Sequence, residues 1–265
     1  MLSLACQEQL LPGATLESKW DFARAAGYDA IELRGQGDLA LEKRLPELRH
    51  AVGAGVVLRT VCVDMPHFLG AFDADLRADA IRQLRSQLSV IAEVGGVGAM
   101  TPASYGMFSR RLPPFEPPRD AAGDREVLLA GLAELGEHAA AEGVTLFLEP
   151  LNRYEDHMVN RLEQAVSLID EVGLASVRIG ADTYHMNIEE DDPVTSLVMF
   201  GGYVGHLQVS DSNRLQPGAG HVDWPRVLRA LEGIGYAGDL AVESLLRGNP
   251  ADAVASVPAF LRALA

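Results

Sequence analysis

Hydrophobic and polar positions alternate in a regular rhythm along the chain. Short runs of β-branched or apolar residues are each followed by an amphipathic segment, with a repeat of roughly thirty residues. This rhythm is typical of a (β/α)8 barrel, in which every parallel strand is followed by a helix. We therefore expect an α/β fold, a (β/α)8 TIM barrel that forms a single domain over residues 1–265. The predicted strands are Ser3–Cys6, Ala30–Arg34, Val56–Asp64, Val97–Thr101, Val144–Glu149, Val177–Asp182, Val204–Val209 and Leu240–Glu243.

Helix boundaries are predicted from capping residues and from apolar spacing. Leucine and isoleucine recur at helical spacing through Asp73–Val94, and leucine does so through Arg125–Glu142. The first helix is predicted over Thr15–Ala26, with Thr15 as its N-cap and Gly27 after its end. Other helix starts are predicted at a capping box formed by Asn160 and Glu163, at Asp223 before Trp224 and Pro225, and at Asn249 before Pro250.

Prolines predict two further features. Pro258 is expected to break or kink the last helix, because proline has no amide hydrogen to donate. The connection Pro102–Asp124 contains the run PPFEPPRD and is too long for a simple turn. It would follow the fourth strand, on the face where the loops of such a barrel build the active site. It is either a passive surface loop or a partial lid over a substrate.

Composition and charge narrow the class of protein. The chain has 265 residues, 48% hydrophobic and 22% charged, which is an ordinary globular composition. Its formal net charge of −15 argues against a nucleic-acid partner, which usually requires a basic surface. Cys6 and Cys62 are expected to be reduced, buried thiols. No signal peptide or membrane-spanning run is evident, so we expect a cytoplasmic enzyme with no membrane partner.

Polar residues stand where the last four predicted strands end. Glu149, Asp182 and Glu243 close three of these strands, and the stretch VGHLQVSDSNR gives the fourth His206 and Gln208. In that strand the two polar side chains alternate with leucine and valine and therefore share one face. Because catalytic groups of such barrels lie at the carboxyl ends of the strands, these side chains are expected to converge.

Three converging carboxylates repel one another unless their pKa values rise or a cation neutralises them. A divalent metal bound by oxygen-rich ligands is the simplest remedy. A single acid after a strand is more often a solvated loop residue. The same placement on consecutive strands favours a metal site over coincidence. Glu32 and Arg34, which end the second strand, could form a salt bridge or contact a sugar, and a structural pair is the favoured interpretation.

Four motifs in this part of the chain carry a family resemblance. They are LEPLNRYED, ADTYHMNIEEDDP, GHLQVSDSNRLQPGAGHVDW and the final VES. Together they resemble the xylose-isomerase-like sugar phosphate isomerase/epimerase superfamily, nearest its ketose 3-epimerase branch of the D-tagatose and D-psicose 3-epimerase type. The likeness is dense from Glu149 to Glu243 and looser elsewhere.

The resemblance implies roles for individual residues and a sugar substrate. The metal ligands would be Glu149, Asp182, Gln208 and Glu243, and the two glutamates would also be the catalytic acid and base. The residues contacting substrate oxygens would be Glu155, His185 and Arg214, and His206 would lie beside the ligands. A homo-oligomer is a further expectation, because a dimer is common in the family.

Gln208 departs from the epimerase pattern. That strand usually reads His-x-His in the branch, and the second His binds the metal, whereas a Gln stands there in hydroxypyruvate isomerases. An amide oxygen completes an all-oxygen ligand set, which favours Mn²⁺, with Mg²⁺ or Co²⁺ as alternatives. The reaction expected is proton transfer through an enediolate on a ketose or related α-hydroxy-carbonyl. Alternatives are hydroxypyruvate isomerase, an inosose-dehydratase-like lyase and an endonuclease-IV-like DNA repair enzyme.

Overall fold

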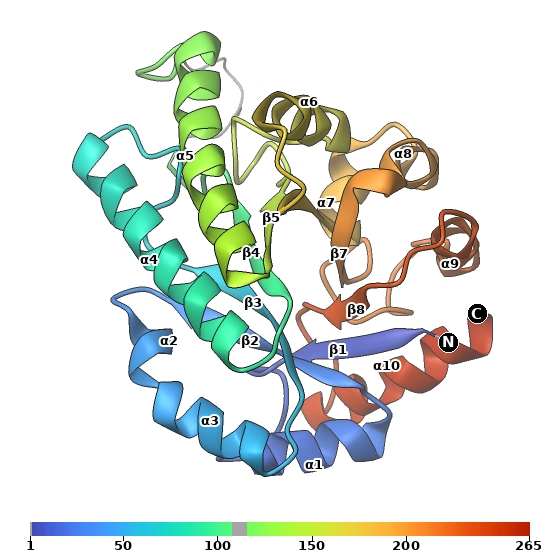
Figure 1. Ribbon diagram of the computed structural model, residues 1–265. Helices are drawn as coiled ribbons and strands as arrows, with labels where there is room; N and C mark the ends of the chain where they lie inside the picture. Colours follow the sequence, from blue (N-terminus) through green and yellow to red (C-terminus); the bar gives the residue numbers. More distant parts are fainter. Residues whose placement is uncertain (1, 108–115) are drawn as a thin grey trace.

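Eight parallel strands close into one barrel, and the intervening helices surround it (Figure 1). The computed structural model describes residues 2–107 and 116–265. The strands are β1 (Ser3–Gln7), β2 (Ala30–Gln36), β3 (Leu58–Asp64), β4 (Gly98–Pro102), β5 (Thr145–Glu149), β6 (Val177–Asp182), β7 (Val204–Val209) and β8 (Asp239–Val242). β1 pairs with β8 and thereby closes the sheet. The predicted TIM barrel is confirmed.

Helices follow the strands in the expected order. They are α1 (Leu16–Ala26), α2 (Ala40–Lys43), α3 (Leu45–Gly53), α4 (Ala74–Glu93), α5 (Ala121–Glu142), α6 (Leu162–Val172), α7 (Thr183–Glu189), α8 (Pro193–Phe200), η1 (Gly201–Tyr203), α9 (Trp224–Gly233) and α10 (Pro250–Leu264). The sequence pattern did not predict α2, α3, α7, α8 or η1. Among the described residues, no helix is both long enough and apolar enough to cross a bilayer.

Most predicted caps are confirmed, and one is wrong. Thr15 and Asp223 each accept a backbone N–H of the first helical turn. The capping box assigned to Asn160 and Glu163 lies one residue too early. The N-cap of α6 is Arg161, and Gln164 Oε1 accepts the Asn160 and Arg161 amides at 2.8 and 3.0 Å. Gln164 completes the capping box because it is the third residue of the helix, and from this position its side chain can accept the N–H of the N-cap residue.

Pro258 does not break the last helix. It lies inside α10, which runs continuously from Pro250 to Leu264. Because Pro258 has no N–H, the carbonyl of Val254 lacks its usual helical partner. The Tyr28 hydroxyl donates to that carbonyl at 2.8 Å and satisfies it. A side chain from the connection between α1 and β2 thus replaces the missing hydrogen bond, and the predicted break at Pro258 is wrong.

The proposed lid is only partly described. The connection after β4 includes residues 108–115, which lie outside the described residues. Its described end is tied down, since Arg119 donates to the Gly70 carbonyl and to Asp124, at 2.7 and 2.6 Å. Whether the connection covers a substrate stays a prediction.

The hydrophobic core lies mainly between the sheet and the helices. Leu146 and Leu148 of β5 and Leu240 and Val242 of β8 are fully buried in this layer. The layer inside the barrel is different, because a small alanine cluster at β1, β2 and β8 gives way to buried polar side chains. Residues of that polar interior, each at most 2% exposed, are Gln7, Glu32, Thr60, His206 and Gln208. Such a barrel interior needs hydrogen bonds as well as packing to be stable.

Candidate active site at the carboxyl ends of the strands

The acids predicted from the sequence lie at one end of the barrel. Glu149 and Asp182 are the last residues of β5 and β6, and Glu243 directly follows β8. Asp182 pairs with Gln208 across β6 and β7. The Glu243 amide donates to the Val209 carbonyl at 3.3 Å, which extends β8 by one residue. Consecutive strands therefore deliver these four side chains to the same rim.

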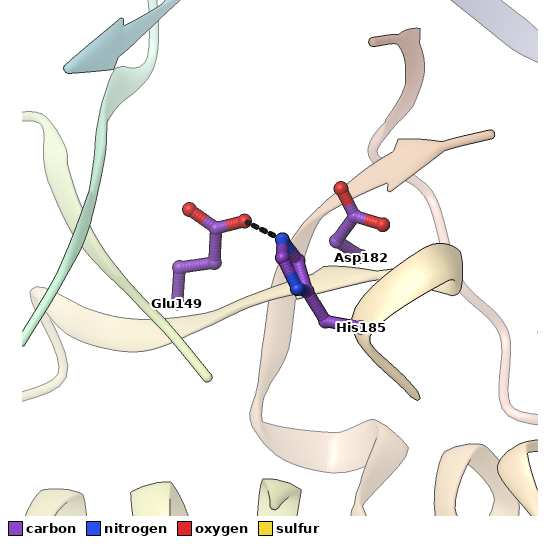
Figure 2. Close-up of side chains that lie close together, drawn as sticks. All are labelled: Glu149, Asp182 and His185. Atoms are coloured by element: carbon purple, nitrogen blue, oxygen red, sulfur yellow. Dashed lines mark ion pairs between the residues drawn. The ribbon is translucent and has the colours of Figure 1, made fainter. Parts of the chain in front are cut away.

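Glu149, Asp182 and His185 form a compact buried cluster (Figure 2). One potential ligand atom of each lies within 4.8 Å of the others. Asp182 is also the N-cap of α7, since its Oδ1 accepts the Tyr184 amide at 2.7 Å. This cap starts α7 and so places His185 over the strand ends. His185 Nε2 faces Glu149 Oε1 at 3.7 Å.

Asn152 determines which nitrogen of His185 carries the hydrogen. The backbone N–H of Asn152 donates to His185 Nδ1 at 3.1 Å, and its side-chain amide lies 2.9 Å from the same atom. A nitrogen that accepts these hydrogens cannot carry its own, so the neutral ring is protonated on Nε2. Burial lowers the pKa of His185 to about 4. His185 is therefore a neutral ring that presents an N–H to the cluster.

Glu149 and Glu243 have raised pKa values. Burial, with repulsion from Glu243 and Asp182, raises the pKa of Glu149 well above its ordinary value. Burial also raises the pKa of Glu243, and the neighbouring Asp182 adds to this while Arg214 opposes it, giving about 7. With a pKa of about 7, the Glu243 carboxyl can hold or release a proton near neutral pH.

Arg214 bridges two of the carboxylates. Its guanidinium donates to Asp182 Oδ2 at 2.5 Å and to Glu243 Oε2 at 2.6 Å. It also lies over the Tyr184 ring, 5.0 Å from the centroid. The backbone of Arg214 is left-handed, with φ of 61°, and Leu245 N–H donates to its carbonyl at 2.7 Å. An arginine held in this uncommon conformation indicates a position fixed by its surroundings.

Glu32 is the centre of the polar barrel interior. Its Oε1 accepts from Gln208 Nε2 at 2.7 Å and from Gln7 Nε2 at 3.2 Å. Its Oε2 accepts from Thr60 Oγ1 at 2.8 Å and lies 2.7 Å from His206 Nε2. Burial alone would raise the pKa of Glu32, but His206 and the donors from Gln208 and Thr60 outweigh it and hold that pKa below its usual value.

The predicted pairing of Glu32 with Arg34 is wrong. Successive residues of a strand point to alternate faces, so positions two apart share a face, yet only Glu32 lies deep enough to meet the barrel interior. Arg34 stands nearer the rim and pairs with Asp64 of β3 at 2.5 Å, half exposed. Glu32 and Arg34 therefore each pair with residues of other strands and not with each other.

The residues at this end fit a divalent cation. Gln208 Oε1 is buried and has no hydrogen-bond partner among residues 2–107 and 116–265. An orphaned carbonyl oxygen beside a carboxylate cluster fits a hard cation, which takes oxygen ligands. His185 fits less well despite its closeness, because the hydrogen on Nε2 occupies the position that a metal would need.

Other residues near the cluster were partly anticipated. Glu155 Oε2 lies 3.9 Å from His185 Nε2. His206 contacts Glu32 and the Phe147 ring, with ring centroids 5.4 Å apart. Asn152 was not predicted as a site residue, although its place in LEPLNRYED, three residues after the end of β5, is a usable signal. The sequence analysis also took Cys62 as buried, whereas this thiol is partly exposed and lies 3.9 Å from Glu243 Oε1.

Comparison with known proteins decides the family. The model of the xylose isomerase-like TIM barrel matches residues 20–264. The chain belongs to this family. It is 35% identical to 3-dehydro-D-guloside 4-epimerase of Escherichia coli K12, over 98% of this chain and 99% of that relative. It is 30% identical to L-ribulose 3-epimerase of Mesorhizobium japonicum, over 83% of this chain and 72% of that relative.

A solved structure of the family superposes closely. The apo crystal structure of 3-keto-D-glucoside 4-epimerase from E. coli has a TM-score of 0.94 and 34% identity, covering 99% of this chain and 100% of that one. The resemblance seen in the four motifs is therefore confirmed, and this member of the family is an enzyme whose relatives are sugar epimerases.

Proposed function

We propose that this protein is a divalent-metal-dependent epimerase that inverts the hydroxyl-bearing carbon next to the carbonyl of a keto sugar. The main supporting observation is a pair of glutamates with raised pKa values at the ends of β5 and β8, Glu149 buried and Glu243 partly buried. The relatives support this choice of substrate. A 4-epimerase of a 3-dehydro sugar and a 3-epimerase of a 2-ketose both invert the carbon beside a ketone.

In this proposal Glu149 and Glu243 are the acid and base. One removes the proton from the carbon beside the carbonyl, and the other returns a proton to the opposite face of the resulting enediolate. The pKa of about 7 suits Glu243 to either role, since it can hold or release a proton at neutral pH. Because each glutamate belongs to a different strand, the two can approach one carbon from different sides.

His185 and Glu155, with Arg214, are proposed to hold the substrate. The Nε2–H of His185 is a neutral donor aimed into the cluster, which suits it to the oxygen that gains negative charge. Arg214 offers a guanidinium at the same end of the barrel. Asn152 fixes the ring of His185 and so maintains this donor.

The cation is proposed to be held by Glu149, Asp182, Gln208 and Glu243, with Mn²⁺ as the preferred ion and Mg²⁺ or Co²⁺ as alternatives. When bound, a divalent cation polarises the substrate carbonyl and lowers the pKa of the adjacent C–H. Gln208 is preferred to His185 as the fourth ligand, because its carbonyl oxygen is orphaned while His185 Nε2 carries a hydrogen. An all-oxygen ligand set favours these ions over Zn²⁺.

The first test is turnover of defined sugars. The protein is incubated with Mn²⁺ and a panel of 2-ketohexoses, ribulose and 3-keto-glucosides, and products are identified by NMR. We expect epimer pairs, and a loss of kcat of about 10³-fold in Glu149→Gln and in Glu243→Gln. Glu8→Gln is the matched control, since Glu8 is also buried but pairs with Arg44.

Other products would redirect the assignment. An aldose product would indicate an isomerase, and an enone-type absorbance would indicate a dehydratase. Cleavage of an abasic DNA duplex would replace the sugar chemistry altogether. Full turnover in both glutamine variants would refute the two-carboxylate mechanism.

A further inference from the structure

We propose that Glu32 is a positioning residue that turns the carbonyl oxygen of Gln208 toward the metal. This inference rests on the proposed function, because it assumes that Gln208 is a metal ligand. Glu32 touches neither the carboxylate cluster nor any position assigned to substrate. Glu32 acts through the Gln208 amide, which it holds from the polar interior of the barrel.

The first step is that Glu32 can only accept hydrogen bonds. Three side chains, Gln7, Thr60 and Gln208, donate to its carboxylate at 2.7 to 3.2 Å, and His206 Nε2 lies 2.7 Å from its Oε2. A side chain that is 0% exposed and ringed by donors is an ionised acceptor. His206 Nε2 therefore carries its hydrogen toward Glu32, which leaves this nitrogen unable to bind the metal.

The second step concerns the two ends of the Gln208 amide. An amide has a donor end and an acceptor end, and only the hydrogen-bond partners decide which way each points. At 2.7 Å from an ionised oxygen of Glu32, the Gln208 NH₂ group is stabilised, whereas its carbonyl oxygen would be repelled. Glu32 therefore holds Gln208 in one orientation.

The third step is where the other end of the amide points. Gln208 is opposite Asp182 in the β6–β7 register, and its Oε1 is buried without a partner among the described residues. Such an oxygen costs free energy unless a ligand satisfies it. Partners that orient a metal ligand in this way commonly contribute 10- to 100-fold to metal affinity.

The test is Mn²⁺ binding by calorimetry and electron paramagnetic resonance, with the metal alone as the probe. Glu32→Gln should weaken Mn²⁺ binding by about 10- to 100-fold. Glu8→Gln, the matched buried glutamate, should bind within about twofold of wild type, since Glu8 bonds to Arg44. Equal Mn²⁺ affinity in Glu32→Gln and wild type would overturn the inference while leaving the proposed function intact.

A double-mutant cycle separates positioning from mere charge. If Glu32 acts by orienting the amide, Glu32→Gln should have no further effect on Mn²⁺ affinity in a Gln208→Ala background. An equal loss in both backgrounds would show that the negative charge of Glu32 acts through space, and would overturn the inference. If circular dichroism shows that Glu32→Gln does not fold, Thr60→Val replaces it, because Thr60 donates to Glu32 Oε2.

Thr60→Val should weaken Mn²⁺ binding by about 3- to 10-fold, since one of the bonds that hold Glu32 is lost. Unchanged binding in this variant would overturn the inference. Wild-type protein that turns over a keto sugar without binding Mn²⁺, Mg²⁺ or Co²⁺ would instead refute the metal part of the proposed function.

Discussion

At the scale of single residues, the Arg214 guanidinium and the proposed cation would compete for the same carboxylate oxygens. The Arg214 guanidinium binds Asp182 Oδ2 and Glu243 Oε2, two of the groups proposed to hold the cation. A guanidinium and a divalent ion that use the same carboxylates stabilise the same negative charge. With the metal site as proposed, we expect Arg214 to stabilise the metal-free protein and to oppose metal binding.

Replacing Arg214 should separate these two effects. Arg214→Gln should lower the free energy of unfolding of the metal-free protein by about 2 kcal/mol, because Asp182 and Glu243 lose a partly buried partner. It should also tighten Mn²⁺ binding by about 3- to 10-fold, since the competitor is gone. Denaturant unfolding with EDTA and calorimetry measure the two quantities.

The control for this prediction is Arg153→Gln. Arg153 follows β5 and binds Glu189 at 2.8 Å, so its loss should leave Mn²⁺ affinity within about twofold of wild type. Weaker Mn²⁺ binding in Arg214→Gln than in Arg153→Gln would contradict the competition between guanidinium and metal.

At the scale of elements, the segment after β7 is held by one buried acid. Asp211 is fully buried and accepts from the Ser212, Gly218 and Val222 amides and from Trp224 Nε1. These bonds run from the strand end to the start of α9 and enclose Arg214. Burial would raise the pKa of Asp211, but the bonds from Trp224 and the backbone outweigh it and lower that pKa.

Asp211→Asn should therefore destabilise the protein in a pH-dependent way. At pH 7 we expect a loss of about 2 kcal/mol, since an amide replaces a charged acceptor of several N–H groups. A carboxyl with a lowered folded-state pKa stabilises above its unfolded pKa of about 3.9, and this contribution fades as the pH falls through the folded value. Urea unfolding from pH 7 to pH 2 should show a constant difference between the wild-type and variant curves above about pH 4, and a shrinking difference below it.

A constant difference between the two curves at all pH values would contradict this account of Asp211. Ser256→Ala is a suitable control, because the Ser256 hydroxyl donates within α10, to the Ala253 carbonyl at 2.8 Å. Its effect on stability should not change with pH, since no titratable group is altered.

The elements also show what can be predicted from sequence. The alternation of polar and apolar residues predicts which face of a strand is polar, and parallel strands end at one rim. The convergence of Glu149, Asp182 and Glu243 could therefore be predicted from the sequence. The partners of Glu32 could not be predicted, because they depend on the register that places Gln7 of β1 and Thr60 of β3 beside it and on which residues of β7 meet it across the barrel. That meeting depends on the stagger of the closed sheet, which one sequence does not state.

Loop residues were harder to predict for another reason. Asn152 lies in one of the four motifs, but its partner could not be predicted, because His185 is 33 residues away and receives a backbone N–H of Asn152 as well as facing its side-chain amide. The left-handed backbone of Arg214 was equally hidden, because no glycine signals it. Helix α10 was misread at Pro258 because the compensating donor, Tyr28, lies far away in sequence.

At the scale of the whole molecule, the barrel has two functional layers. The rim carries the acids proposed for chemistry, and the polar interior beneath it carries Glu32 and its donors. Helix α7 adds His185 to the rim, and the apolar layer between the sheet and the helices supports both layers. The fold alone is compatible with many activities, so the proposed epimerase rests on the rim residues and on full-length relatives.

The most direct test of the central claim is solvent deuterium incorporation. The protein is incubated in D₂O with Mn²⁺ and the keto sugar that it turns over, and the product is examined by NMR and mass spectrometry. Because Glu149 and Glu243 exchange protons with solvent, the account predicts one deuterium at the inverted carbon, and almost no product from Glu149→Gln or Glu243→Gln. An epimer that keeps its original hydrogen at that carbon would contradict it.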